Sequence, residues 1–291
     1  MGDGSTEWKK ELVLTEIIQD ESMTVLNYLI LFCASLVLCS VGFKNFVYFM
    51  SVGYGFAIAG LAILLALLFP RSLTLASGVA LLVFVLYGAR LSGFLLYREF
   101  RNKNYKKVFN EASGSNGQMP VFVKIAIWIV CAVLYVLQVL PLAFRLTNAP
   151  TGEGLLWLGI VLSVLGLILE SAADLEKSAQ KKERADMVAM KGLYRFTRCP
   201  NYCGEILFWT GVLIGALNTL VGPLQWLLSI LGYVSIVYVM ISGAARLEKK
   251  QNKRYGDKKE YQEYVKRTPI LLPLIPIYHL SKQEAKSDEV K

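Results

Sequence analysis

Residues 192–221 read GLYRFTRCPNYCGEILFWTGVLIGALNTLV, and this stretch decides the fold. Its first half carries arginines, tyrosines, an asparagine and a glutamate, whereas its second half is almost wholly apolar. Pro200 suits the first turn of a helix, because its missing N–H would be unpaired there anyway. We therefore expect an apolar helix that begins near Pro200 and places Asn201 and Glu205, four residues apart, on one face.

The polar half of this stretch predicts a binding site. Charged and polar groups at a membrane are costly, and they tend to persist where they bind a ligand or one another. Six of them fall within the fourteen residues 192–205. Polar side chains that merely extend to the aqueous surface from a membrane helix do not account for so many. Arg198 lies just before the predicted helix, whose electropositive start also favours an anion. The motif therefore indicates a site for an anionic, hydrogen-bonding ligand at a membrane–water boundary.

The whole chain has the composition of a polytopic membrane protein. Of its 291 residues, 55% are hydrophobic, and the mean hydropathy is +0.46. A spanning helix needs about 20 apolar residues. The fold class that follows is all-α, a bundle of about seven transmembrane helices. The seven apolar runs are 25–43, 46–69, 73–97, 121–144, 154–171, 203–221 and 224–244.

Charge predicts the orientation of these spans. Residues 1–24 carry a net charge of −4, whereas the 98–119 and 173–200 loops each carry +3 and the tail from Arg246 carries +5. Seven spans place the three basic segments on one side, which the positive-inside rule makes cytosolic. Basic cytosolic segments that face anionic lipid headgroups thus explain the net charge of +9. No nucleic-acid partner is expected.

Several kinds of site lack the residues that they need. His279 is the only histidine, so neither a Ser–His triad nor a histidine-rich metal site is expected. Cys199 and Cys203 would face the cytosol, where disulfides are disfavoured. The chain has no P-loop and no G-x-G-x-x-G motif, so any nucleotide must bind in a helical cavity.

We expect helix to continue beyond two of the spans. Residues 170–181 place charges at helical spacing, so the fifth span should extend out of the bilayer. Residues 246–266 should form an interfacial helix that is interrupted at Tyr255 and Gly256, and three prolines after it should end helical structure. The predicted parts are an acidic non-cytosolic N-terminus (1–24), N-terminal transmembrane helices (25–84), a membrane domain (85–276) and a flexible cytosolic tail (277–291), with a flexible loop at 113–117.

A second polar cluster lies in the third span. Tyr87 and Arg90 are three residues apart on one face, about two turns from Arg98. The long Arg90 side chain could extend its guanidinium to the cytosolic surface, but the depth of Arg90 in the span favours contact with a ligand. Two other groups have a structural alternative. Asp174 and Lys181 could belong to a solvated charged helix, and Arg246 could be a positive-inside anchor.

The run GLYRFTRCPNYCGEILFWTGVLIGAL at 192–217 is similar to the C-terminal signature of the steroid 5-alpha-reductase family. It looks closest to the branch known as domain of unknown function 1295 (DUF1295). Further similar segments are ESAADLEKSAQK at 170–181, SGAARLEK at 242–249 and YQEYVKRTPILLP at 261–273. The resemblance covers about residues 85–276.

This resemblance implies a bundle of about seven transmembrane helices and an endoplasmic reticulum location. It also implies an enzyme that uses NADPH to reduce an activated C=C bond in a lipid-like, sterol or steroid-like enone. Tyr87 and Arg90 would be the catalytic residues that face the substrate and cofactor. The residues implied to bind the cofactor are Asp174, Lys181, Tyr194, Arg195, Arg198, Asn201, Tyr202 and Glu205, together with Arg246 and Tyr255.

These residue types suit that chemistry. Arginine and lysine neutralise the phosphates of NADPH, and the Asn201 carboxamide can pair with the nicotinamide amide. Hydride addition to an enone builds negative charge on the carbonyl oxygen, and a buried hydroxyl such as that of Tyr87 can donate to it. The chain departs from the family at two places. Cys199 stands where many relatives have histidine, and the second span lacks the acid that contacts the substrate carbonyl.

Two other functions are compatible with the motif. One is a membrane methyltransferase of the isoprenylcysteine or phospholipid type, which uses S-adenosylmethionine. Such enzymes usually carry paired glutamates after the last span, where this chain has Glu248 followed by Lys249 and Lys250. The other is a non-catalytic lipid-binding protein descended from a reductase. The expected partners are a lipid-like small molecule and membrane lipids.

Overall fold

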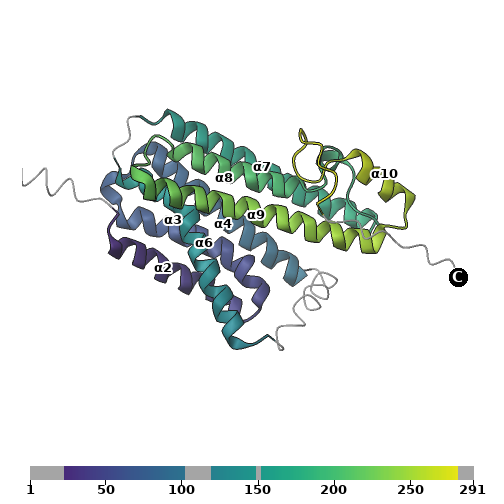
Figure 1. Ribbon diagram of the computed structural model, residues 1–291, viewed down its shortest axis with the longest axis horizontal. Coiled ribbons are helices and arrows are strands. Elements are labelled where there is room, and N and C mark those ends of the chain that lie inside the picture. The colour runs from purple at the N-terminus through teal and green to yellow at the C-terminus, as the bar shows by residue number, and fades with distance from the viewer. Residues whose placement is uncertain (1–22, 102–118, 149–151, 281–291) are drawn as a thin grey trace, which may run out of the picture. The chain divides into compact units, whose positions relative to one another are not determined.

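The structure is a computed structural model that describes residues 23–101, 119–148 and 152–280 (Figure 1). Within these ranges the chain forms eight α-helices and no strand, so the all-α prediction is confirmed. The helices are α2 (Val25–Cys39), α3 (Val52–Leu68), α4 (Leu75–Arg101), α6 (Val121–Thr147), α7 (Gly154–Glu183), α8 (Pro200–Ala216), α9 (Gly222–Tyr255) and α10 (Lys259–Arg267). The predicted acidic N-terminus, the 113–117 loop and most of the predicted tail lie outside the described residues.

Each of the seven predicted apolar runs contains a helix. Five stretches are long and apolar enough to cross a membrane: Val25–Phe43, Leu75–Tyr97, Val121–Thr147, Gly154–Glu183 and Gly222–Tyr255. The helix α3 is apolar but has 17 residues, and α8 also has 17. Both lie at the lower end of the range of about 17–25 residues with which a helix spans a bilayer.

Two of the differences from the predicted bounds have a visible local cause. Residues 46–50 form a 3-10 helix, η2 (Phe46–Met50), in place of the start of a span. Its cause is local, because the Asn45 side chain accepts a hydrogen bond from the Val47 N–H at 3.1 Å and caps a separate turn. The helix α8 begins at Pro200, as the proline predicts, and ends at Ala216, whose carbonyl accepts the Thr219 N–H at 2.9 Å.

The predicted helical extensions are confirmed. The fifth span continues as a charged helix to Glu183, and the last span continues to Tyr255. The chain then breaks at Gly256 and resumes as α10. From Thr268 to Leu280 the chain contains no helix, in agreement with its three prolines.

The chain divides into two compact units. The first comprises the residues up to Ile160 together with Val212–Gly232. In it α2, α3, α4 and α6 pack pairwise, and α3 and α4 cross at two glycines. A Cβ at Gly88 would lie 2.2 Å from the Gly55 carbonyl oxygen. The close approach therefore depends on the absence of a side chain at both positions.

The second unit comprises Val161–Gly211 and the residues from Tyr233 onward. Here α7 and α8 cross at Gly166 and Gly204, since a Cβ at either glycine would lie 2.5–2.7 Å from backbone atoms of the other helix. The Ser163 hydroxyl donates to the Phe208 carbonyl at 2.9 Å across the same crossing. The motif at 192–205 thus begins α8 and, through Gly204, fixes it against α7.

Replacing Gly88 by Ala is expected to destabilise the first unit. Its methyl group would force α3 and α4 apart, and overpacking of this kind costs about 1–3 kcal/mol. Gly78→Ala, on the same helix but with no heavy atom near its Cβ, is the control, and it should be neutral or stabilise by up to about 1 kcal/mol. Thermal unfolding in detergent measures both variants, and equal midpoints for the two would contradict this helix crossing.

Candidate functional site

Ten of the twelve predicted site residues belong to the second unit. Two lie on α7, two on the 3-10 helix η4 (Gly192–Arg195), one in the loop before α8, three on α8 and two on α9. The remaining two, Tyr87 and Arg90, lie on α4 in the first unit.

Two side chains of α7 hold the turn that precedes η4. The Gln180 Oε1 accepts the N–H groups of Met190 and Lys191 at 2.9 and 3.0 Å, and its Nε2 donates to the Lys191 carbonyl at 3.0 Å. One turn earlier, Glu176 accepts the Leu193 N–H at 2.8 Å. Gly192 adopts a φ of +63°, and a Cβ there would strike the Glu176 carboxylate at 2.4 Å. The loop at 190–193 is therefore built by α7.

Tyr194 is buried where this turn meets α7. Its hydroxyl donates to the Ala173 carbonyl at 3.2 Å, and its own carbonyl accepts from the Tyr264 hydroxyl at 2.7 Å. Burial raises the pKa of Tyr194 far above its usual range, and the Asp174 charge adds to the shift. The phenol therefore stays protonated, and its oxygen keeps a lone pair with which it could accept from a ligand.

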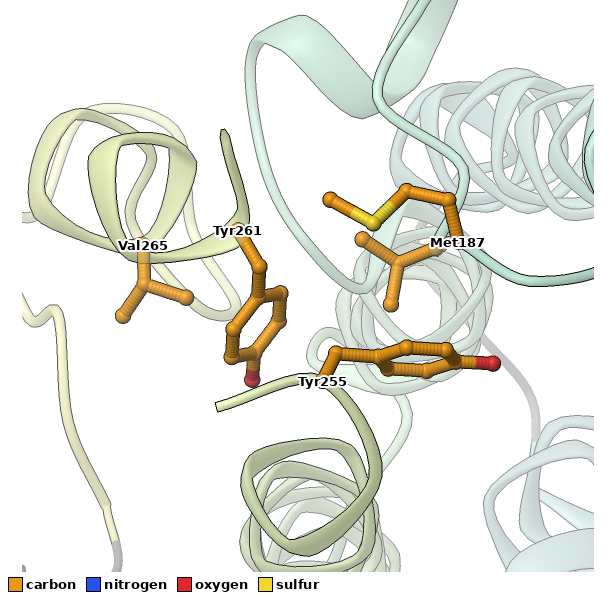
Figure 2. Packing of buried hydrophobic residues seen from close by; sticks show 5 residues of the cluster. Met187, Tyr255, Tyr261 and Val265 are labelled. Atoms are coloured by element: carbon orange, nitrogen blue, oxygen red, sulfur yellow. The ribbon is translucent and has the colours of Figure 1, made fainter. Parts of the chain in front are cut away.

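Lys181 and Tyr255 are brought together although 74 residues separate them. The Lys181 Nζ donates to the Tyr255 hydroxyl at 2.9 Å and to the Met187 carbonyl, and it lies 4.9 Å from the centre of the tyrosine ring. Tyr255 belongs to a buried cluster in which residues of α9, of α10 and of the segment after α7 meet (Figure 2). The labelled members are Met187, Tyr255, Tyr261 and Val265.

Two surface ion pairs tie α10 to the segment after α7. Arg184 forms a two-bond pair with Glu260 at 2.9 Å, and the Lys258 Nζ donates to Asp186 at 2.7 Å. These contacts lower the pKa of both carboxyl groups. The apolar cluster and the two pairs together fix α10 beside the predicted site.

The centre of the second unit is a buried ion pair. The Arg198 Nη2 lies 3.0 Å from the Glu248 Oε1, and the side chains are 2% and 0% exposed. The same carboxylate accepts the Leu280 N–H at 2.9 Å and lies 3.1 Å from the His279 Nδ1. The Arg198 Nη2 also donates to the Tyr278 carbonyl. The pair thus joins the loop before α8, helix α9 and the C-terminal segment.

Three buried polar atoms, two of Arg198 itself and one of Asn201, have no hydrogen-bond partner among the described residues. They are the Nε and Nη1 of Arg198 and the Oδ1 of Asn201. Burial raises the pKa of Tyr261 to about 12, whereas the Arg198 charge and a side-chain hydrogen bond with Arg198 oppose that rise. Tyr261 therefore lies beside the guanidinium, and its own hydroxyl donates to the Asn252 Oδ1 at 2.6 Å. Buried polar groups are normally bonded, so two donor nitrogens and one acceptor oxygen remain for a ligand or water.

The other predicted residues of this unit vary in exposure. Glu205 is buried, Asp174 and Tyr202 are half-buried, and Arg195 and Arg246 are exposed. The Tyr202 ring packs at Gly243 of α9, where a Cβ would lie 3.4 Å from it. The structure therefore offers exposed cations at 195 and 246 and a buried polar group at the start of α8.

Cys199 occupies the position at which many relatives have histidine, and here it belongs to the core. It packs with Ala244, Ile270 and Leu271. Burial raises the pKa of its thiol to about 11. The thiol therefore stays protonated. Cys199 packs as a small apolar residue and does not provide the acid–base group that a histidine could provide there.

The first unit contains a buried group of tyrosines around Tyr87. The Tyr87 hydroxyl donates to the Tyr54 hydroxyl at 3.0 Å, and Tyr54 stacks on Tyr135 with ring centres 5.0 Å apart. Arg90 is half-buried and lies over the Phe94 ring at 5.6 Å. Tyr54 lies in α3, the second apolar run, in which sequence reasoning looked for an acid and found none.

Sequence reasoning missed the roles of Glu248 and Gln180 as well as that of Tyr54. Glu248 carried a signal, because it is an acid among basic residues at the end of an apolar run. Gln180 and Tyr54 carried none, since their partners lie at least 10 and 33 residues away in the chain. No cluster of three or more potential metal ligands occurs within 23–101, 119–148 and 152–280.

The fold and this site define a helical membrane protein with a buried polar centre at the start of an apolar helix. A family profile described as "Protein of unknown function (DUF1295)" matches residues 41–268. The chain therefore belongs to the DUF1295 family. No curated protein and no solved structure matches the chain.

Replacing Glu248 by Gln is expected to lower the free energy of unfolding by about 3 kcal/mol, because Arg198 then stays buried and charged without a carboxylate. Adding Arg198→Met should recover part of this loss. Glu260→Gln removes a carboxylate from an exposed pair and should leave the unfolding midpoint unchanged. Urea unfolding in mild detergent measures all three, and equal effects at 248 and 260 would contradict the buried pair.

Proposed function

We propose that the protein is a membrane oxidoreductase that reduces an activated C=C bond of a lipid-like enone with NADPH. The observation that carries the proposal is the set of unbonded buried atoms at Arg198 and Asn201. They lie within the motif that is similar to the C-terminal signature of the steroid 5-alpha-reductase family.

These atoms suit the groups that NADPH presents. Arg198 offers two unbonded nitrogens, Nε and Nη1, whose N–H groups lie in one rigid plane, which matches phosphate or ribose oxygens. The Asn201 Oδ1 needs a donor, and the nicotinamide carboxamide has an N–H. Arg195, Arg246 and Lys181 add positive charge for a ligand that carries several phosphate charges. When bound, NADPH would supply the hydride.

The chain itself would supply the proton and the apolar surroundings. Tyr87 is fully buried and holds its proton in a hydrogen bond with Tyr54. A neutral phenol aimed at a carbonyl oxygen stabilises the negative charge that develops there. Tyr54 could take the place of the missing second-span acid: when the carbonyl binds, the Tyr87 O–H would turn from Tyr54 to the carbonyl oxygen, and the Tyr54 O–H could then donate to the Tyr87 oxygen. Arg90 would assist on the same face of α4.

A lipid-like substrate fits the surroundings of Tyr87. The residue lies within Leu75–Tyr97, a stretch apolar enough to cross a membrane. Water is scarce at such a depth, and an apolar ligand can enter from the lipid.

The charge distribution supports a cytosolic C-terminus, and the resemblance supports the endoplasmic reticulum.

The ligand is identified first by thermal stability with NADPH, NADH and S-adenosylmethionine in parallel. A ligand at 100 times its dissociation constant adds about 2.7 kcal/mol of stability. We expect a shift with NADPH, and Asn201→Ala should reduce it at the same concentration. A shift with S-adenosylmethionine alone would indicate the methyltransferase instead. No shift in folded protein would indicate the non-catalytic relative.

Arg246→Ala is expected to weaken NADPH binding by roughly 10- to 100-fold, because a hydrogen bond to a charged group contributes about 1.5–3 kcal/mol. Arg246 is exposed, so the fold should be unaffected. Lys253→Ala, which removes an exposed cation from the same helix, is the matched control. Fluorescence titration with NADPH measures both, and equal affinities for the two variants would make Arg246 a positive-inside anchor only.

Tyr87→Phe is expected to slow the reduction of an enone lipid by about 10²–10⁴-fold, since it removes the proton donor. The dissociation constant of NADPH should not change. Tyr238→Phe, at an exposed tyrosine of α9, is the control. Single-turnover oxidation of NADPH gives the rate, and an unchanged rate in Tyr87→Phe would remove the residue from the catalytic group.

A further inference from the structure

The segment after α10 carries an apolar turn that the proposed chemistry does not use. We call residues 271–277 the apolar turn. Leu274 is 94% exposed, and Ile275 and Ile277 are 43% and 47% exposed. Pro273 and Pro276 flank the tip and are exposed as well. Three large aliphatic side chains within four residues are unusual on a surface that faces only water.

The apolar turn is held in place by hydrogen bonds. The Ile270 N–H donates to the Ile277 carbonyl at 2.8 Å and closes its base, and the Ile275 N–H donates to the Leu272 carbonyl at 3.2 Å. The Thr197 hydroxyl donates to the Leu271 carbonyl at 2.9 Å. The exposed side chains therefore project from a fixed support, so little conformational entropy is lost when a partner binds them.

The base of the turn lies at the level where the helices of this unit leave their apolar stretches. Ile270 and Leu271 pack with Cys199, directly before the start of α8, and with Ala244 of α9. Just beyond Ala244, α9 changes from an apolar sequence to a charged one. This change marks the edge of the hydrocarbon region, where a bilayer has its headgroups.

The neighbours of the turn have the chemistry of a membrane interface. Phe196, adjacent to Thr197, is 65% exposed, and aromatic side chains are typical of the headgroup level. Lys266 and Arg267 at the end of α10 are exposed and basic, which suits anionic headgroups. Apolar, aromatic and basic side chains thus gather at the edge of the hydrocarbon region.

We infer that the apolar turn inserts into the headgroup and upper acyl region of the bilayer that the protein spans. Its partner is a lipid surface, and Leu274 is the residue that enters most deeply. The segment that carries the turn bonds twice to the loop before α8, because the Thr197 hydroxyl donates to the Leu271 carbonyl and the Arg198 N–H donates to the Pro269 carbonyl at 2.9 Å. Insertion would therefore brace the loop that holds the buried ion pair.

Photo-crosslinking in vesicles tests this inference on the full chain. A diazirine-bearing amino acid is placed at position 274, or at Glu263 on the exposed face of α10 as the matched control. Each protein is reconstituted in vesicles of phosphatidylcholine and phosphatidylserine, irradiated, digested and examined by mass spectrometry. Both positions are exposed, so both proteins should fold, and an unchanged unfolding midpoint confirms it.

The expected result is severalfold more phospholipid adduct at position 274 than at position 263. Three results would overturn the inference: only water adducts at 274, equal lipid adducts at the two positions, or adducts joining 274 to a second copy of the chain. The last would identify the turn as a protein interface.

Discussion

The second unit depends on one buried ion pair. A charge removed from water is costly, so Arg198 and Glu248 are tolerated only because each neutralises the other and further bonds satisfy the carboxylate. The pair draws together the loop before α8, helix α9 and the segment 278–280. It also leaves two guanidinium nitrogens unbonded, and these point to a ligand. One arginine therefore serves both the architecture and the proposed chemistry.

Much of the helical architecture could be predicted, because apolar length and proline position act locally. The start of α8 at Pro200 and the extension of α7 to Glu183 followed from residues adjacent in the chain. The start of α3 was wrong by six residues, because continuous apolar sequence does not distinguish a 3-10 turn capped by Asn45 from a helix. Hydropathy is insensitive to that difference.

The site was harder to predict, since its pairings are tertiary. The family resemblance implied roles for Lys181, Arg198 and Tyr255, but not that Lys181 bonds to Tyr255 or that Arg198 bonds to Glu248. Gly204 was part of the motif, and only the close approach of α7 explains why a side chain would not fit there. Residues 74 and 50 positions apart leave no local pattern that could reveal such contacts.

Membership of the DUF1295 family agrees with these features, and the proposed reductase activity gives them a chemical purpose. Cations that are exposed at 195 and 246 can recruit phosphates, while the buried atoms at 198 and 201 can select a ligand by hydrogen bonding. The tyrosine group around Tyr87 would be the acid that such a reaction requires. Exposed cations and buried hydrogen-bonding atoms together suit a charged cofactor, and the apolar surroundings of Tyr87 suit an apolar substrate.

The most direct measurement is a cryo-EM structure of the full chain in a lipid nanodisc with NADPH. We expect nucleotide density within hydrogen-bonding distance of the Arg198 Nη1 and the Asn201 Oδ1, with the Arg198–Glu248 pair intact. Density elsewhere, with ordered water on those atoms, would contradict the proposed cofactor site.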